Sequence, residues 1–211
     1  MDRDRPASLG PLPAPGSDFS YSEPVNAAVP PAIGILGWLP VADRPDLLAA
    51  PVRAAIQEQG LDCFVSPIDP SLADTAAFCA AYDVPLEVSA NCVVVAGRRA
   101  EVSVMAACLV LATDRADVNK TIRKHLDVRK ISFAGMAEAV AQTGMEYGGI
   151  TPLGLPAGWP ILMDGRVAAQ EWIVIGSGIR GSKIALRPSE LDKLPQVTTM
   201  PLALETPDGR R

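Results

Sequence analysis

Apolar residues recur at helical spacing in several segments of the chain. Leu48, Val52 and Ile56 fall on one face of a helix that Gly60 is placed to end. A window of small residues follows, and later windows repeat the same spacing with polar residues between. These signals predict further helices over 72–82, over 114–126 with Asp114 as its cap, over 136–142 and over 187–194.

Continuous apolar runs, bounded by turn residues, predict buried strands between these helices. They occupy residues 33–39, 62–68, 91–97, 103–113, 159–164, 171–178, 183–186 and 197–203. The polar sequence GRRAE separates the runs 91–97 and 103–113, which is typical of a hairpin. Helices and strands do not alternate strictly, so we expect an α+β domain in which helices flank a curved, mixed and largely antiparallel sheet.

The two ends of the chain lack this patterning. Residues 1–32 contain seven prolines among Gly, Ser and Ala, which predicts a flexible leader. Residues 206–211 are polar and predict a frayed tail. The remaining 33–205 are long enough for one sizeable core, so we expect a single domain there.

Charge narrows the classes of partner. The formal net charge of −5 argues against a protein that binds DNA or other long nucleic acids through their phosphates. One basic cluster stands out, and it could contact RNA locally or form an ordinary exposed surface. Its members are Lys120, Arg123, Lys124, Arg129 and Lys130. Neither a signal peptide nor a membrane-spanning run is present in the sequence, so we expect a cytoplasmic protein.

The sequence offers few of the side chains on which most hydrolases depend. The single histidine, His125, lies among charged residues of a predicted helix, and the four cysteines form no C-x-x-C pair. No glycine motif typical of nucleotide binding follows a strand, so we expect neither a metal nor a cofactor. Hydrolysis of an already activated ester needs less, because main-chain N–H groups can stabilise the oxyanion, each contributing about 3 to 4 kcal/mol.

The segment GMEYGGITPLG at 144–154 could supply such groups. Glycine lets the main chain approach a ligand closely, and Pro152 would stiffen the loop. The alternative interpretation is a helix stop at Gly144 followed by two turns.

This segment, followed by Asp164 in PILMD and by GSGIRG at 176–181, resembles the YbaK/ProX family of aminoacyl-tRNA deacylases. That family is related to the editing insertion of bacterial prolyl-tRNA synthetase, and the resemblance covers about residues 72–203. It implies a YbaK-type fold and hydrolysis of a mischarged amino acid from the 3′ end of a tRNA. A synthetase is a further candidate partner.

The resemblance also implies where the site lies. The expected catalytic positions are Gly149, Ile150, Asn91 and Asp164. The expected substrate-binding positions are Cys92, Gly148, Thr151, Pro152, Gly154, Ser177, Gly178 and Lys183. As structural alternatives, Asn91 could simply end a strand, Asp164 could form a turn and Cys92 could be a small buried residue.

One position departs from the family pattern, which usually has a lysine where this chain has Asn91. Lys183 or Arg180 would then have to provide the positive charge, because an amide provides none. Otherwise the chain is a non-catalytic binding module for an aminoacyl end, an amino acid or a synthetase. Hydrolysis of small esters unrelated to tRNA is a third interpretation.

Overall fold

The structure, a computed structural model, describes residues 30–204. All but the last three positions of the predicted leader, 1–32, lie outside the described residues, and so does the whole of the predicted tail, 206–211. Within 30–204, no helix combines the length and the apolar character needed to cross a bilayer. The strands of this part divide between two sheets.

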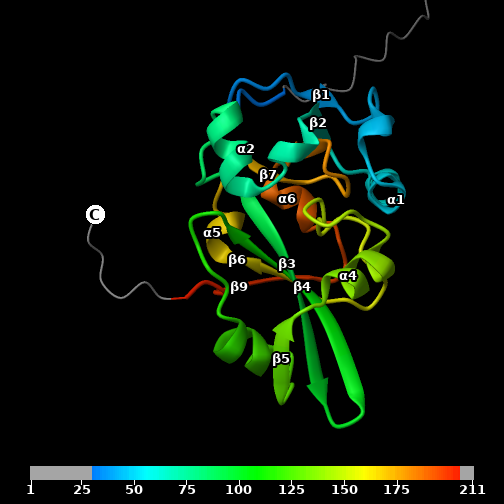
Figure 1. Ribbon diagram of the computed structural model, residues 1–211, viewed down its shortest axis with the longest axis vertical. Coiled ribbons are helices and arrows are strands. Elements are labelled where there is room, and N and C mark those ends of the chain that lie inside the picture. Colours follow the sequence, from blue (N-terminus) through cyan, green and yellow to red (C-terminus); the bar gives the residue numbers. More distant parts are fainter. Residues whose placement is uncertain (1–29, 205–211) are drawn as a thin grey trace, which may run out of the picture.

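The four-stranded sheet is antiparallel throughout. Its order is β1 (Leu39–Pro40), β2 (Cys63–Pro67), β8 (Ser182–Leu186) and β7 (Ile173–Gly176). β2 and β8 pair along their whole lengths, with Val65 opposite Ile184. Helices α1 (Ala50–Gln59) and α2 (Thr75–Tyr82) precede and follow β2, at the same end of the molecule in Figure 1.

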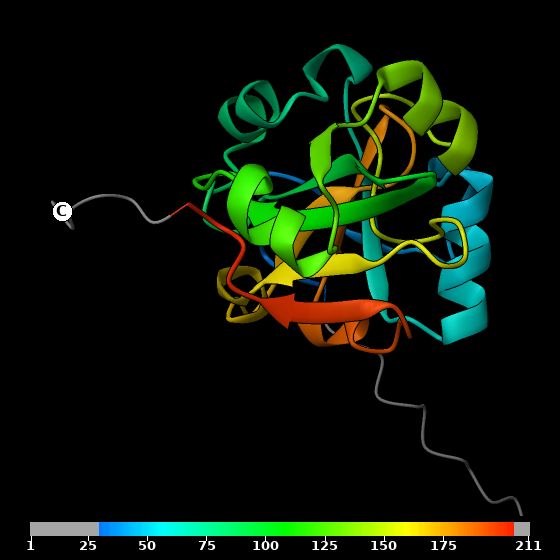
Figure 2. The same ribbon diagram turned by 90° about the horizontal axis from the view of Figure 1, so that it is seen from below.

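The five-stranded sheet is mixed. Its order is β5 (Lys130–Phe133), β3 (Ala90–Arg99), β4 (Val102–Leu111), β6 (Ile161–Asp164) and β9 (Val197–Met200). β3 is antiparallel to β4 and β5, whereas β6 is parallel to β4 and β9, beside which it lies in Figure 2. The β3–β4 hairpin is confirmed, and Figure 1 shows it extending with β5 away from β1, β2 and α2.

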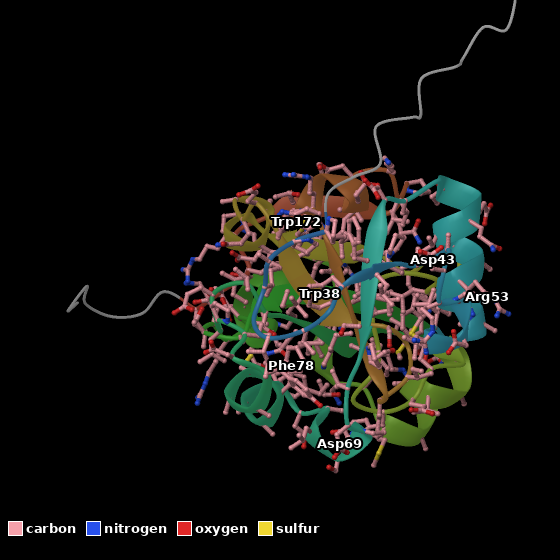
Figure 3. All side chains as sticks on the ribbon, turned by 90° about the horizontal axis from the view of Figure 1, so that it is seen from above. Trp38, Asp43, Arg53, Asp69, Phe78 and Trp172 are labelled. Carbon is pink, nitrogen blue, oxygen red and sulfur yellow. The ribbon has the colours of Figure 1, made fainter. Side chains whose placement is uncertain are left out.

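The two sheets share one core. Side chains alternate between the faces of a strand, so each sheet turns one apolar row inward. Val65 and Ile184 of the four-stranded sheet belong to the same buried cluster as Leu109 and Ile161 of the five-stranded sheet. Val52 and Ile56 bring the inner face of α1 into this cluster, while Arg53 of the same helix points to solvent in Figure 3.

Helices cover the outer faces of both sheets. Phe78 of α2 packs with Trp38 and Trp172 over the four-stranded sheet, and all three are labelled in Figure 3. A π-helix (Val118–Ile122), continued by α3 (Arg123–His125), covers the five-stranded sheet. The remaining helices are α4 (Met136–Thr143), α5 (Gly165–Ala168), α6 (Pro188–Leu191) and two 3₁₀ turns, Pro45–Leu47 and Pro70–Leu72.

The α+β class is confirmed, although its strands form two facing sheets. Gly60 ends α1 in the left-handed conformation, as predicted. The strand predicted over 33–39 is wrong, because Gly34 adopts a φ of +61° and leaves Ile35 exposed, and only Leu39 enters β1.

The cap predicted at Asp114 is also wrong. Asp117 accepts hydrogen bonds from the N–H groups of Lys120 and Thr121 instead, at 3.2 and 3.1 Å. Asp114 pairs with Arg166 at 2.5 Å.

Candidate active site

A pocket of about 420 Å³ opens beside the first residues of β3, with which β5 does not pair. β5 pairs with β3 over Val95–Arg98 only, which leaves the edge at Asn91, Cys92 and Val93 without an adjacent strand. All three of these residues line the pocket. The rest of its wall comes from the start of α2, the β5–α4 connection, the glycine-rich loop and strands β7 and β8. The volume is in the range of small-molecule sites.

A polar wall forms where α2 begins. Asp74 and Thr75 line the pocket, and the Thr75 hydroxyl donates a 2.6 Å hydrogen bond to Oδ1 of Asn91. The amide nitrogen of Asn91 has no acceptor among residues 30–204 and can therefore donate to a ligand. Asn91 thus interacts with a neighbouring side chain, which differs from the strand-end alternative of bonding only to local backbone.

Lys183 supplies a positive charge to the same pocket. It is 8% exposed, and its Nζ donates a 2.9 Å hydrogen bond to the carbonyl of Ala73. The Phe78 ring centroid lies 5.0 Å from Nζ. Burial lowers the pKa of Lys183 from 10.5 to about 8, and the nearby Asp74 carboxylate partly opposes this shift.

Arg180, the other candidate cation, is not part of the pocket wall. Its Nε donates to the carbonyl of Pro70 at 3.1 Å and its Nη1 to that of Tyr147 at 3.3 Å. It therefore joins the segment before α2 to the glycine-rich loop from outside.

Two N–H groups of the glycine-rich loop have no partner among the described residues and are available to a ligand. Gly148 and Ile150 line the pocket, and their N–H groups have no acceptor within the part of the chain that the structure describes. Gly148 adopts a φ of +84°, which favours glycine. Gly149 differs, because its N–H already donates to the carbonyl of Glu146 at 2.9 Å.

Gly149 joins the glycine-rich loop to the loop between β7 and β8. Its carbonyl accepts a 2.8 Å hydrogen bond from the N–H of Gly178, whose own carbonyl accepts one of the same length from Glu146. The Glu146 carboxylate also accepts a 2.6 Å bond from the N–H of Arg180. A Cβ on Gly149 would lie 2.7 Å from the carbonyl carbon and oxygen of Ile179, so only glycine permits this approach.

The remaining glycine-loop residues lie behind the pocket wall. Thr151 and Pro152 are buried, and the Thr151 hydroxyl has no hydrogen-bond partner among the described residues. Gly154 has a φ of +74° and packs directly against the main chain of Pro51 in α1. These three expected substrate-binding residues are not among those that line the pocket.

Ser177 and Gly178 also lie behind the wall. The Ser177 hydroxyl is fully buried and lies 2.6 Å from that of Ser182, which donates to the carbonyl of Leu47 at 2.5 Å. A side chain on Gly178 would collide with Ala49 and Val52. Both residues hold the loop against α1.

Asp164 lies elsewhere, and the position near the pocket expected for it is not the one observed. One carboxylate oxygen accepts a 2.8 Å hydrogen bond from the N–H of Arg166 and caps α5. The other accepts bonds from the N–H groups of Leu202 and Ala203, at 2.6 and 2.9 Å. Asp164 is buried with its oxygens occupied and does not line the pocket, so we assign it a structural role.

Cys92 lines the pocket without the properties of a nucleophile. Burial raises the pKa of its thiol far above the ordinary value, and no charged group opposes this effect. The protonated thiol is a small apolar part of the wall. The described residues contain no group of three or more His, Cys, Asp or Glu residues that could hold a metal ion.

Several wall residues carry no sequence signal that identifies a site. Asp74 and Thr75 show an ordinary helix-start pattern, which does not indicate a pocket. Phe133 and Met136 flank the β5–α4 connection, whose position becomes evident only from the pairing of β5 with β3. Tyr147 belongs to the segment GMEYGGITPLG, in which the glycines, and not the aromatic ring, form the recognisable pattern.

A family model described as the aminoacyl-tRNA editing domain matches residues 69–194. This span includes both joined loops and the start of α2. A search of curated proteins gives no match.

Solved structures share the fold at low sequence identity. One is a candidate trans-editing enzyme for prolyl tRNA synthetase, with 19% identity, a TM-score of 0.64 and coverage of 74% of this chain and 97% of the other. A hypothetical protein has 17% identity and a TM-score of 0.64, and the match covers 73% of this chain and 99% of the other. A candidate signal transduction protein from Marinobacter aquaeolei VT8 has 14% identity and a TM-score of 0.54. The match covers 75% of this chain and 31% of the other.

Proposed function

Because this chain belongs to the aminoacyl-tRNA editing domain family, we propose that it hydrolyses the ester of a mischarged tRNA in trans. The acyl group would occupy the pocket, and the N–H groups of Gly148 and Ile150 would bind its carbonyl oxygen. The observation that carries this proposal is the presence of both amides, without acceptors among the described residues, in one wall of a pocket that also contains Lys183.

The reaction needs little more from the protein. Water adds to the acyl carbon, and the carbonyl oxygen becomes an oxyanion that the two N–H groups stabilise. The C–O bond to the ribose then breaks, and the ribose oxygen leaves with a proton as the hydroxyl of the tRNA. In the family that the chain resembles, a hydroxyl of the substrate's own ribose helps to position the attacking water, which suits a pocket without histidine.

Lys183 would replace the charge that Asn91 cannot provide. Its ammonium group is fixed by Ala73 in a wall that Asn91 also lines, so negative charge developing in the pocket would meet a cation. A hydrolytic step after aminoacylation is useful, because one methylene changes the free energy of binding in a synthetase pocket by only about 1 to 3 kcal/mol.

The test is release of labelled amino acid from a panel of mischarged tRNAs. Gly148→Ala places a Cβ against Arg180 and strains the loop, so we expect kcat to fall by about 100-fold as the two amides move. Gly158→Ala is the matched control, because Gly158 has nearly the same φ, +85°, but an added Cβ there meets no atom within 4 Å. Equal effects of the two substitutions, or no turnover of any tRNA, would contradict the proposal.

A non-catalytic binding module is the second candidate, and the presence of Asn91 favours it. Under this alternative the natural protein binds an aminoacyl end without turnover, and Asn91→Lys gains hydrolysis. Hydrolysis by the natural protein excludes it.

A further inference from the structure

Exposed apolar side chains gather at the rim of the pocket. Eight large apolar side chains are exposed among residues 30–204, and three of them line this one pocket. Phe133 is 66% exposed, Met136 55% and Tyr147 58%. Such a concentration around a concave site is typical of a surface that another molecule covers.

The three side chains come from two separate parts of the wall. Phe133 ends β5 and Met136 begins α4, whereas Tyr147 belongs to the glycine-rich loop, next to the amide of Gly148. Two of the three are therefore aromatic rings beside the position proposed for the acyl carbonyl.

The chemistry of an aminoacyl-tRNA puts a nucleobase at this rim. The ester is formed by a hydroxyl of the terminal ribose, so the base of that nucleotide is only one sugar ring away from the acyl group. An acyl group held by Gly148 and Ile150 would leave the base at the mouth of the pocket. Aromatic side chains bind bases by stacking, largely without regard to sequence.

Charge favours RNA over a protein as the occupant. β5 connects the rim to the basic cluster, because Arg129 directly precedes this strand and Phe133 ends it. Lys130 lies on the opposite face of β5 from Phe133. Four strand residues span about 13 Å. The π-helix and α3, which carry the other members of the cluster, lie beside β5 in Figure 1. All five basic side chains are exposed, and none forms an ion pair within the described part.

We propose that Phe133, Met136 and Tyr147 form a stacking subsite for the terminal base of a tRNA, whose backbone then follows β5 toward the basic cluster. This inference rests on the proposed function, because it takes the acyl group to lie in the pocket. It adds a contact to a part of the substrate that hydrolysis itself does not require.

The test compares binding of two fluorescently labelled RNA stem-loops to the full chain. Both end in a single-stranded CCA, and one lacks only the terminal base. We expect the abasic RNA to bind about 5- to 150-fold more weakly. Phe133→Ala and Tyr147→Ala should weaken binding of the intact RNA and leave the abasic RNA unchanged, whereas Phe133→Trp should retain affinity. Ile35→Ala, which removes a side chain that is 72% exposed outside the pocket, is the control.

Turnover separates this inference from the proposed function. For mischarged tRNA, Phe133→Ala should raise KM and leave kcat nearly the same, whereas the control Ile35→Ala should change neither KM nor the rate with an amino acid ethyl ester. Hydrolysis of tRNA without any dependence on the terminal base would overturn the subsite and leave the proposed function intact. Base-dependent binding without hydrolysis would support the subsite and contradict the proposed function. Alanine variants that bind RNA normally but lose self-association or synthetase binding would show that the rim serves a protein partner, and would also overturn the subsite.

Discussion

Lys183 is subject to two opposing effects. Burial disfavours its charged form, whereas the nearby Asp74 carboxylate favours it. The result is a pKa of about 8, so the ammonium form still predominates at neutral pH. A buried cation of this kind reduces stability, and it persists where a negative charge has to be bound.

The pH dependence of stability should report on this residue. The folded pKa of about 8 lies below the ordinary 10.5, so between these values the unfolded chain binds more protons and the free energy of unfolding rises with pH. We expect a contribution of about 3 kcal/mol across this window, absent in Lys183→Met. Denaturant unfolding at several pH values measures it, with Lys120→Met as the control, because Lys120 is exposed and forms no ion pair within the described part.

The thiols act in the opposite sense and do not obscure the result. Burial raises the pKa of Cys63 and Cys108 to about 12, so above pH 9 their contributions lower the stability of both proteins alike. The difference between natural protein and variant therefore reports on Lys183 together with Cys79, whose pKa burial raises and the nearby lysine lowers. Parallel pH profiles of the two would show that the lysine is not desolvated as described.

At the scale of elements, the two glycine loops form one unit. The reciprocal bonds between Glu146, Gly149 and Gly178 fix the glycine-rich loop to the β7–β8 loop, and Gly176 packs directly against the carbonyl of Gly149. The positions of the Gly148 and Ile150 amides thus depend on the contact of Gly149 with the β7–β8 loop.

Gly149→Ala should separate the loops. Its Cβ would meet the rigid main chain of Ile179, so we expect a loss of about 1 to 3 kcal/mol in the free energy of unfolding. Gly165→Ala is the control, because a Cβ there meets no atom within 4 Å and the φ is ordinary. Chemical denaturation of both variants measures the difference, and equal stabilities would mean that the approach of the two loops is not tight.

Sequence patterns predicted the elements where local chemistry decides them. Gly60 and Gly144 end their helices in the left-handed conformation, and the predicted hairpin turns at Ala100 and Glu101, the last two residues of GRRAE. Patterns failed where two residues could cap the same helix, or where one glycine turned the chain within an apolar run. Asp117 caps the helix in place of Asp114 because its carboxylate reaches two main-chain N–H groups. The apolar run at 33–39 does not form the predicted strand, because Gly34 turns the chain within it.

The site was predictable as a region but not atom by atom. The segment GMEYGGITPLG does form part of the wall. Which of its groups face the pocket depends on long-range packing: Gly154 against Pro51 and Gly149 against Ile179. Asp164 shows the same limit, because its three N–H partners include residues almost forty positions away.

At the scale of the whole molecule, charge is unevenly distributed. The chain carries a net charge of −5, yet five exposed basic residues lie on and next to β5 and α3. An acidic surface repels RNA in general, so a local basic cluster would direct an RNA toward one approach.

Salt titration tests this arrangement. Removing Lys120, Arg123 and Lys124 together should weaken binding of an RNA stem-loop at low salt. It should also reduce the slope of log K against log salt by about 0.7 for each phosphate that the variant no longer neutralises. Arg53→Ala, on the exposed face of α1, should leave the slope unchanged. An unaltered slope in the triple variant would favour a small ester as the substrate.

The interlocking of the two loops also limits how relatives of this chain could exchange specificity. A recombinant that received only residues 144–154 would place the carbonyl of Gly149 against whatever side chain the host has in place of Gly176. The two segments, more than twenty residues apart in the sequence, must therefore be inherited or transplanted together. Evolution of specificity for a different amino acid would therefore require coordinated changes in both segments.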